Sequence, residues 1–351
     1  MTLGHNFDFE SYQKVLEAGR LGLTPWQTNR YNYGPTWSLI LRAFDWTGSK
    51  TNTGLRFQIV ALLTIADLYI SYFIYRFKGP LIAALFFVNP ISVFITGYHN
   101  QFDNLAIAIV CGSILVLKRN NFQNIFSQHL IAVILLGITL TLKHIFLFFI
   151  LWLMARQKTV LLKLLYLFGP LLLLALSMLP YLGSSWASIK LNVIDYKSFN
   201  NSPFLTLIGL EEIIDPTSFF VLLMCALAYI FRKIELEQSF FIYCVLLVTF
   251  SPAVANQYLV TAAVGAFGLL NRGFIVYTIY GGYWLMVSHH GLGIVRETRV
   301  VGNLFYFVPL PTYVLHVGYT VFPILLIYGL TVCYKSSRQS GSVVERRTRN
   351  A

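Results

Sequence analysis

The chain has 351 residues, of which 56% are hydrophobic and 11% are charged, and its mean hydropathy is +0.65. One soluble core of this length cannot bury so much apolar side chain, so the composition excludes an ordinary soluble domain and indicates that lipid solvates much of the surface. The formal net charge of +12 does not indicate a nucleic-acid partner, because most Lys and Arg residues stand in short clusters between apolar runs.

Apolar runs long enough to approach or cross a hydrocarbon layer of about 30 Å begin near Leu55. Residues 1–55 precede them as a polar, aromatic-rich leading segment. The runs predict an all-α, polytopic transmembrane helical bundle of about eleven spans in residues 56–335. Spans are expected near residues 56–77, 79–97, 102–117, 128–142, 144–155, 160–182, 218–231, 240–250, 258–270, 273–288 and 311–334. Residues 336–351 are polar and basic without apolar periodicity, which predicts a disordered cytoplasmic tail.

The short loops between these runs predict an orientation, because Lys and Arg resist translocation. Successive short loops should lie on opposite sides of the membrane, and the loops of one side hold nearly all of the basic loop residues. That side is predicted to be the cytoplasm. Its basic residues are Arg76, Lys78, Lys118, Arg119, Arg156, Lys158, Arg232, Lys233, Arg272, Lys335 and Arg338. The leading segment then lies on the extracytoplasmic face. Export of such a segment is awkward without a signal, so we expect either a first helix upstream of Met1 in a longer gene product or unaided export.

Polar groups are scarce in this chain, so the outer loops that concentrate them form the candidate site. The stretches are HNFDFESYQ with the downstream RYNYGPTW, then GYHNQFDN, a Lys-His pair at a helix corner, and SPAVANQY. The candidate residues in chain order are Asp8, Glu10, His99, Gln101, Asp103, Lys143, His144, Gln257 and Tyr258.

The two leading acids do not by themselves predict a metal site. Asp8 and Glu10 are two residues apart, so an extended segment points both the same way and a helix separates them by about 200°. A divalent cation needs more oxygen ligands than this pair supplies. All four cysteines lie in apolar runs without CxxC spacing, which argues against a disulfide or a metal cluster. We therefore expect no resident metal or other cofactor.

Several candidates also have a purely structural interpretation. Asp8 can be a solvated loop carboxylate, and Asp103 stands where an acid would cap the next helix. Lys143 can extend to the membrane interface along its methylene stem. His289 and His290, in the last outer loop, can equally be ordinary interfacial histidines.

Asp67 stands inside the first predicted span, where a carboxylate is costly and usually faces the protein interior or a cavity. We interpret it as a partner for a neighbouring helix, and a role in transport is the competing interpretation. The alternative function of the whole chain is therefore a polytopic transporter or lipid flippase, although no convincing internal repeat supports it. A third interpretation, a structural subunit of a larger assembly, would leave the outer acids replaceable.

Three stretches resemble bacterial members of the GT-C glycosyltransferase superfamily: the FDFESY setting of the first outer aspartate, the YNYGP stretch, and NPISVFITGYHNQFDNLA. The resemblance extends from the leading segment to about Arg156. It implies a multi-spanning, mannosyltransferase-like enzyme of the bacterial plasma membrane whose extracytoplasmic loops form the site. It also implies a polyprenyl-phosphate sugar donor and a catalytic carboxylate in the first outer loop, which Asp8 matches by position. The chain departs from the superfamily in lacking a span before that loop.

The chemistry assigns roles to these residues. Transfer of a sugar from a lipid phosphate to a hydroxyl with inversion needs a base, and Asp8 is the expected one. The departing phosphate needs positive charge, for which Lys143 beside His144 is the best-placed group and Arg296 and Arg299 are weaker candidates. The other candidates, expected to bind sugar or acceptor, are Glu10, His99, Gln101, Asp103, Gln257 and Tyr258.

The partners are predicted from the same chemistry. No P-loop or glycine-rich nucleotide fingerprint occurs in the sequence, which favours a lipid-linked donor over a nucleotide sugar. We expect a polyprenyl-phosphate sugar as donor, a lipid-linked or envelope glycan as acceptor, contact with membrane lipids, and no nucleic acid.

Overall fold

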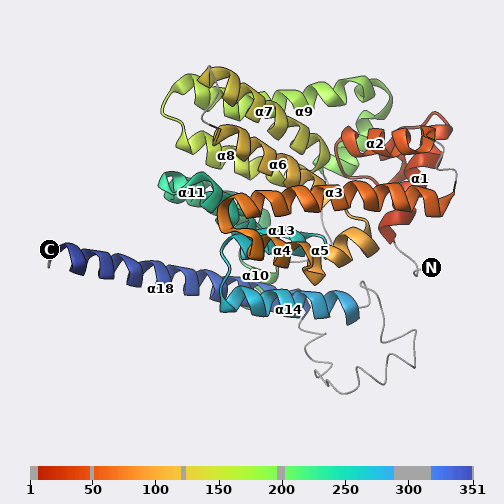
Figure 1. Ribbon diagram of the computed structural model, residues 1–351. Helices are drawn as coiled ribbons and strands as arrows, with labels where there is room; N and C mark the ends of the chain where they lie inside the picture. The colour runs from red at the N-terminus through yellow and green to blue at the C-terminus, as the bar shows by residue number, and fades with distance from the viewer. Residues whose placement is uncertain (1–6, 48–50, 120–123, 196–201, 288–317, 350–351) are drawn as a thin grey trace, which may run out of the picture.

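The computed structural model describes residues 7–47, 51–119, 124–195, 202–287 and 318–349, with the backbone alone for residues 336–349. The described residues are helical or in turns and contain no β-strand, which confirms the all-α prediction. Figure 1 shows the helices packed as a bundle, with the leading helices α1 and α2 at the end where the chain begins.

The described elements follow one another along the chain, with η2 and η4 π-helical and the other η segments 3₁₀-helical. They are α1 Phe7–Arg20, η1 Pro25–Thr28, α2 Pro35–Trp46, α3 Asn52–Lys78, α4 Pro80–Phe87, α5 Pro90–Phe94, η2 Ile95–His99, α6 Asp103–Leu117, α7 Ile125–Leu142, η3 His144–Phe146, α8 Leu147–Arg156, α9 Val160–Ile189, η4 Lys190–Ile194, α10 Pro203–Leu207, α11 Pro216–Ile230, η5 Phe231–Lys233, α12 Leu236–Phe250, α13 Tyr258–Gly268, α14 Arg272–Val287, η6 Gly318–Thr320 and α18 Val321–Arg349.

Among the described residues, five helical segments are long and apolar enough to cross a membrane, judged by length and composition. They are Asn52–Lys78, Pro80–His99, Ile125–Leu142, Val160–Ile194 and Pro216–Lys233. Shorter apolar helices occupy Asp103–Leu117, His144–Arg156, Leu236–Phe250, Tyr258–Gly268 and Val321–Lys335. Together with α14, these segments correspond to the eleven predicted runs, but the count of eleven spans stays a prediction.

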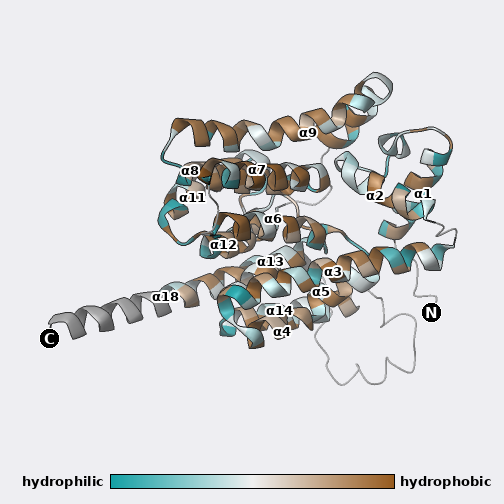
Figure 2. Cartoon of the chain, turned by 45° about the horizontal axis from the view of Figure 1, so that its top comes forward, coloured by the Kyte–Doolittle hydropathy of each residue, from teal (hydrophilic) through white to brown (hydrophobic). Residues whose placement is uncertain are grey.

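The outer face of α9 is apolar and exposed. Leu164, Phe168, Leu172 and Leu176 follow one another at intervals of four residues, and each is at least 47% exposed. Residues four apart lie on the same face of a helix, so these side chains form one continuous stripe. Figure 2 shows the hydrophobic colouring of α9 along the edge of the bundle. A stripe of this length is unfavourable in water and suits hydrocarbon.

Two helices differ in extent from the sequence expectation. The run expected to end at residue 182 continues as α9 and η4 through Ile194. The backbone of α18 is helical through Arg349, whereas disorder is predicted from Ser336. The Gln, Glu and Arg residues there have high helix propensity, so the apolar helix before them can be extended.

The basic ends of several helices gather at one end of the bundle. Lys118, which follows α6, lies 3.0 Å from Glu235 and 2.8 Å from Glu237 at the start of α12, measured from Nζ to Oε2. Lys78, the last residue of α3, places its Nζ 5.8 Å from the ring centroid of Phe241 in α12. Figure 1 shows α1 and the start of α3 at the opposite end.

Candidate functional site

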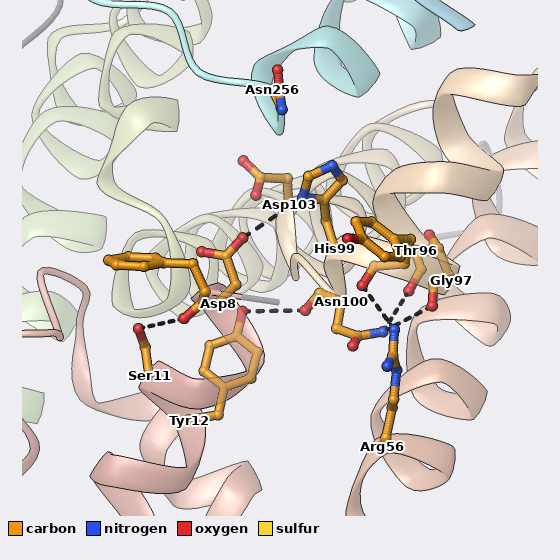
Figure 3. A network of polar contacts seen from close by, with 12 residues as sticks. Asp8, Ser11, Tyr12, Arg56, Thr96, Gly97, His99, Asn100, Asp103 and Asn256 are labelled. Atoms are coloured by element: carbon orange, nitrogen blue, oxygen red, sulfur yellow. Dashed lines mark hydrogen bonds and ion pairs between the residues drawn. The ribbon is translucent and has the colours of Figure 1, made fainter. Parts of the chain in front are cut away.

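Asp8 lies in the first turn of α1, where a negative charge is favoured by the helix dipole. The buried face of α1 carries Phe9 and Tyr12. The Tyr12 hydroxyl donates a hydrogen bond of 3.1 Å to the carbonyl oxygen of Asn100, which fixes α1 against the segment between η2 and α6. Figure 3 shows the Asp8 carboxylate turned toward His99 and Asp103.

The surroundings of Asp8 change its acidity. Burial raises the pKa of Asp8, while a hydrogen bond from the Gln101 side chain and the charge of Lys143 act to lower it. His99 Nδ1 lies 3.9 Å from Asp8 Oδ2, close enough for an ion pair when the imidazole is protonated. The Asp8 side chain keeps 27% of its surface exposed, so a ligand can reach it. A raised pKa makes the carboxylate a stronger base.

Glu10 does not share this position. Because Asp8 and Glu10 both belong to α1, their side chains leave the helix about 200° apart. The extended arrangement, in which both carboxylates point the same way, is therefore not formed. Glu10 remains a candidate only for contacts on another side of α1.

Asp103 and Lys143 form a buried ion pair. Asp103 is the first residue of α6 and Lys143 directly follows α7, and Lys143 Nζ lies 3.0 Å from Asp103 Oδ2. Their side chains are only 1% and 4% exposed. The same Nζ lies 4.4 Å from the ring centroid of Tyr33 and 4.9 Å from that of Phe102, within range of cation–π attraction. Lys143 thus points into the protein rather than toward an interface.

The segment that carries His99 and Gln101 is held by its own backbone contacts. Asn100 adopts the left-handed conformation, with φ 57°, which asparagine tolerates better than most residues. Its Nδ2 donates to the carbonyl oxygens of Thr96 at 3.1 Å and Gly97 at 3.2 Å. Arg56 of α3 donates to the carbonyl oxygen of Tyr98 at 3.1 Å.

Several of these positioning residues were not among the candidates predicted from the sequence. Asn100 stands inside the GYHNQFDN stretch and could have been identified as a turn residue. Tyr12 and Arg56 could not, because their partners lie 88 and 42 residues away in sequence. Tyr33 belongs to the aromatic stretch that the sequence singled out, but nothing in the sequence connects its ring with Lys143.

Three further candidates lie on other segments, and four residues named from the sequence lie outside the described residues. His144 has an exposed surface, whereas Lys143 beside it is buried. Gln257 and Tyr258 flank the start of α13, where Asn256 Oδ1 accepts hydrogen bonds from Trp284 and Tyr319. In Figure 3 Asn256 approaches from the segment before α13. The candidates that lie outside the described residues are His289, His290, Arg296 and Arg299.

The described residues contain no group of three His, Cys, Asp or Glu side chains that could hold a metal ion. The four cysteines, all of them in the described part of the chain, are free thiols. The expectation of no resident metal stays a prediction, as does the absence of another cofactor.

No known family model, curated protein or solved structure matches this chain at a significant level. The resemblance to the GT-C superfamily therefore rests on the sequence stretches alone. Independently of that resemblance, the described residues form an all-helical bundle with helices long and apolar enough to cross a membrane, and a polar cluster lies at the end of the bundle where α1 lies.

Proposed function

We propose that this chain is a membrane glycosyltransferase of the bacterial plasma membrane. It transfers a sugar from a polyprenyl-phosphate donor to a hydroxyl of a lipid-linked or envelope glycan on the extracytoplasmic face, with inversion. The observation that carries the proposal is the position of Asp8. Its carboxylate is partly accessible, has a raised pKa, and faces His99.

In the proposed reaction, an Asp8 carboxylate oxygen takes the proton of the acceptor hydroxyl while the hydroxyl oxygen attacks the anomeric carbon. The bond between that carbon and the phosphate oxygen breaks, and its electron pair leaves with the polyprenyl phosphate. Gln101 holds Asp8 in place through their hydrogen bond. His99, on the other side of the carboxylate, offers a ring nitrogen to the sugar or to the acceptor.

The positive charge for the phosphate comes from two residues in this proposal. Lys143 is engaged by Asp103, so it acts as a fixed charge behind the site instead of a direct ligand. Arg30, on the leading segment, stacks its guanidinium carbon 4.2 Å from the ring centroid of Phe7, the residue before Asp8. A guanidinium group matches phosphate geometry, so we assign the direct phosphate contact to Arg30.

The test is a transfer assay on membranes that contain the parental chain or its Asp8→Asn variant. Labelled polyprenyl-phosphate sugars are added, the lipids and glycans are extracted, and transferred label is measured. The parental membranes should move label to an acceptor and the Asp8→Asn membranes should not. If no polyprenyl-phosphate sugar is consumed by the parental membranes, the transferase proposal fails and the transporter or flippase alternative becomes the leading one.

A further inference from the structure

Asp67, the acid inside the first predicted span, belongs to a cluster that is closed by direct hydrogen bonds. Its carboxylate accepts from Ser92 Oγ at 3.1 Å, from Thr96 Oγ1 at 2.7 Å and from Asn104 Nδ2. These donors belong to α5, η2 and α6, so the carboxylate holds neighbouring segments together. Open polar space lies elsewhere, at the end of the bundle where the chain begins.

A polar cavity of about 230 Å³ lies between α1 and the start of α3. Leu16 of α1 and Leu55 of α3, which are 5% and 4% exposed, give part of its wall an apolar surface. The other side chains that line it are polar and come from α1, the end of α2 and the start of α3: Gln13, Glu17, Arg20, Asp45, Thr51 and Asn52. Figure 1 shows these three helices together at the end of the bundle where α1 lies. The predicted orientation places this end on the extracytoplasmic side.

One wall of the cavity belongs to the helix that carries Asp8. Gln13, Glu17 and Arg20 are four and three residues apart, so they lie on one face of α1. A helix rises about 1.5 Å per residue, so Gln13 lies roughly 8 Å and Arg20 roughly 18 Å from Asp8 along the axis. A ligand in the cavity is therefore too far from Asp8 to react there, but a chain of a few sugar units spans the distance.

The opposite wall leads toward His99. Arg56 directly follows Leu55 in α3, and its Nη2 donates to the carbonyl oxygen of Tyr98 at 3.1 Å. The guanidinium carbon of Arg56 also lies 5.9 Å from the ring centroid of Phe9 in α1. These contacts join α3 to α1 and to the residue before His99, so the cavity has a defined position relative to the proposed active site.

The charges around the cavity favour a neutral ligand. Arg20 donates from Nε to Asp45 Oδ2 at 3.1 Å and from Nη2 to Asp45 Oδ1, so these two residues form a neutral pair. Glu17 adds one negative charge, which disfavours phosphate and other anions. A metal ion is disfavoured as well, because Arg20 already engages both carboxylate oxygens of Asp45.

The polar groups of the wall match a ligand with many hydroxyl groups. The side-chain amides of Gln13 and Asn52 each carry donors and an acceptor, and Arg20 has three N–H groups beyond the two in its ion pair. A sugar hydroxyl also donates and accepts, whereas the C–H groups of a sugar ring suit the two leucines. A volume of about 230 Å³ equals about eight water molecules at about 30 Å³ each, which is enough for one hexose and too little for an oligosaccharide.

We propose that the cavity between α1 and α3 binds one neutral hexose unit of the acceptor glycan, a few units away from the hydroxyl that reacts. That this hexose belongs to the acceptor rests on the proposed transferase function, whereas the binding of a neutral hexose does not. Contacts with a remote part of a substrate help to orient its reacting end. Acceptors long enough to reach the cavity should therefore have a lower KM than acceptors of a single hexose.

The first measurement is saturation-transfer NMR on the purified full-length protein in detergent, with the methyl glycosides of mannose, glucose and galactose as probes. At least one of these neutral hexosides should receive saturation from the parental protein, and the methyl glycoside of glucuronic acid should not. The double variant Gln13→Ala with Glu17→Ala removes two polar groups from the wall, and each lost hydrogen bond weakens binding by roughly 2- to 10-fold. Both side chains are at least partly exposed and Ala favours helix, so α1 stays formed.

Lys14→Ala is the matched control, because Lys14 is an exposed residue of α1 that does not line the cavity. It should leave the saturation signal unchanged. The proposal is overturned if no neutral hexoside receives saturation, if the double variant keeps the parental affinity, or if the glucuronide binds as tightly as the neutral probes.

A transfer assay separates this proposal from the proposed function. A parental protein that binds a hexoside but transfers no label from any polyprenyl-phosphate sugar would remove the transferase function and leave the hexose site standing. Where label is transferred, the double variant should raise the KM for a trisaccharide acceptor toward that for a single-hexose acceptor, with kcat unchanged. An unchanged KM for the trisaccharide would overturn the assignment of the cavity to the acceptor.

Discussion

At the scale of single residues, Asp8 has an environment that an exposed surface acid lacks. Most of its surroundings are protein, which raises its pKa, yet part of the carboxylate stays accessible. We expect Asp8→Asn to lower kcat by about 10² to 10⁴-fold, because the amide keeps the size but cannot accept the proton. Glu10→Gln is the matched control, since it lies on the same turn of α1 and points away. Full activity of Asp8→Asn together with an inactive Asp103→Asn would transfer the base assignment to Asp103.

The acidity of Asp8 also predicts a pH dependence. The base must be ionised, so kcat/KM should fall as the pH drops through the raised pKa of Asp8, above the ordinary value of about 3.9. Gln101→Ala removes a hydrogen bond that lowers this pKa and should move the acid limb of the profile to higher pH. The same raised pKa means that stability contributed by Asp8 is present at low pH and is lost as the pH rises through it. A limb that stays in place in Gln101→Ala would exclude Asp8 as the titrating base.

Lys143 and Asp103 should behave as one unit when either is replaced. Lys143→Met would leave the Asp103 carboxylate buried without its cation. Removing one partner of such a pair costs about 3–5 kcal/mol, because the other charge stays buried. The double variant Lys143→Met with Asp103→Leu should recover most of this loss. Denaturant unfolding of the purified single and double variants measures both, and equal stability of all three proteins would mean that the pair is not buried in solution.

At the scale of helices, most of the described bundle could be predicted from the sequence, because apolar runs separated by basic loops leave few alternatives to helix in lipid. The pairing of Asp103 with Lys143 could also have been anticipated. Consecutive helices such as α6 and α7 run antiparallel when a short loop joins them, so the start of one lies beside the end of the next. The two helices of the leading segment, α1 and α2, were not predicted, because the composition of this segment is polar and rich in aromatic residues. Its contacts with distant segments leave no local sequence signal.

The contact between α2 and α7 gives a test at this scale. Thr36 Oγ1 of α2 lies 2.6 Å from Thr141 Oγ1 of α7, and a Cβ at Gly34 would collide with the carbonyl oxygen of Thr141. Gly34→Ala should therefore lower stability by about 1–3 kcal/mol, as overpacking does. It should also reduce turnover, because Tyr33 lies over Lys143. Gly97→Ala is the control, since a Cβ there meets no atom within 4 Å; equal effects of both substitutions would contradict the close approach.

At the scale of the whole molecule, the two ends of the bundle differ in chemistry. One end carries the basic loop residues that meet the start of α12, and the other carries Asp8 with the buried ion pair. The leading segment has basic residues of its own, such as Arg20, which is paired with Asp45. The distribution of charge over the whole chain therefore does not predict how the bundle is oriented in the membrane. The predicted orientation rests on the short loops, in which Lys and Arg favour the cytoplasmic side.

Cysteine labelling decides this orientation, and with it the face on which the proposed chemistry takes place. The exposed Cys225 and the half-buried Cys333 are first replaced by Ser, and single cysteines are then introduced at Glu17 and Lys233, both exposed and at opposite ends. An impermeant maleimide added to intact cells should label Glu17→Cys at once and Lys233→Cys only after the membrane is opened. Labelling of both from the same side would contradict the alternation of spans. The reversed pattern would keep the bundle but place Asp8 in the cytoplasm, where nucleotide sugars are present, so the main reason for an extracytoplasmic lipid-phosphate donor would be lost.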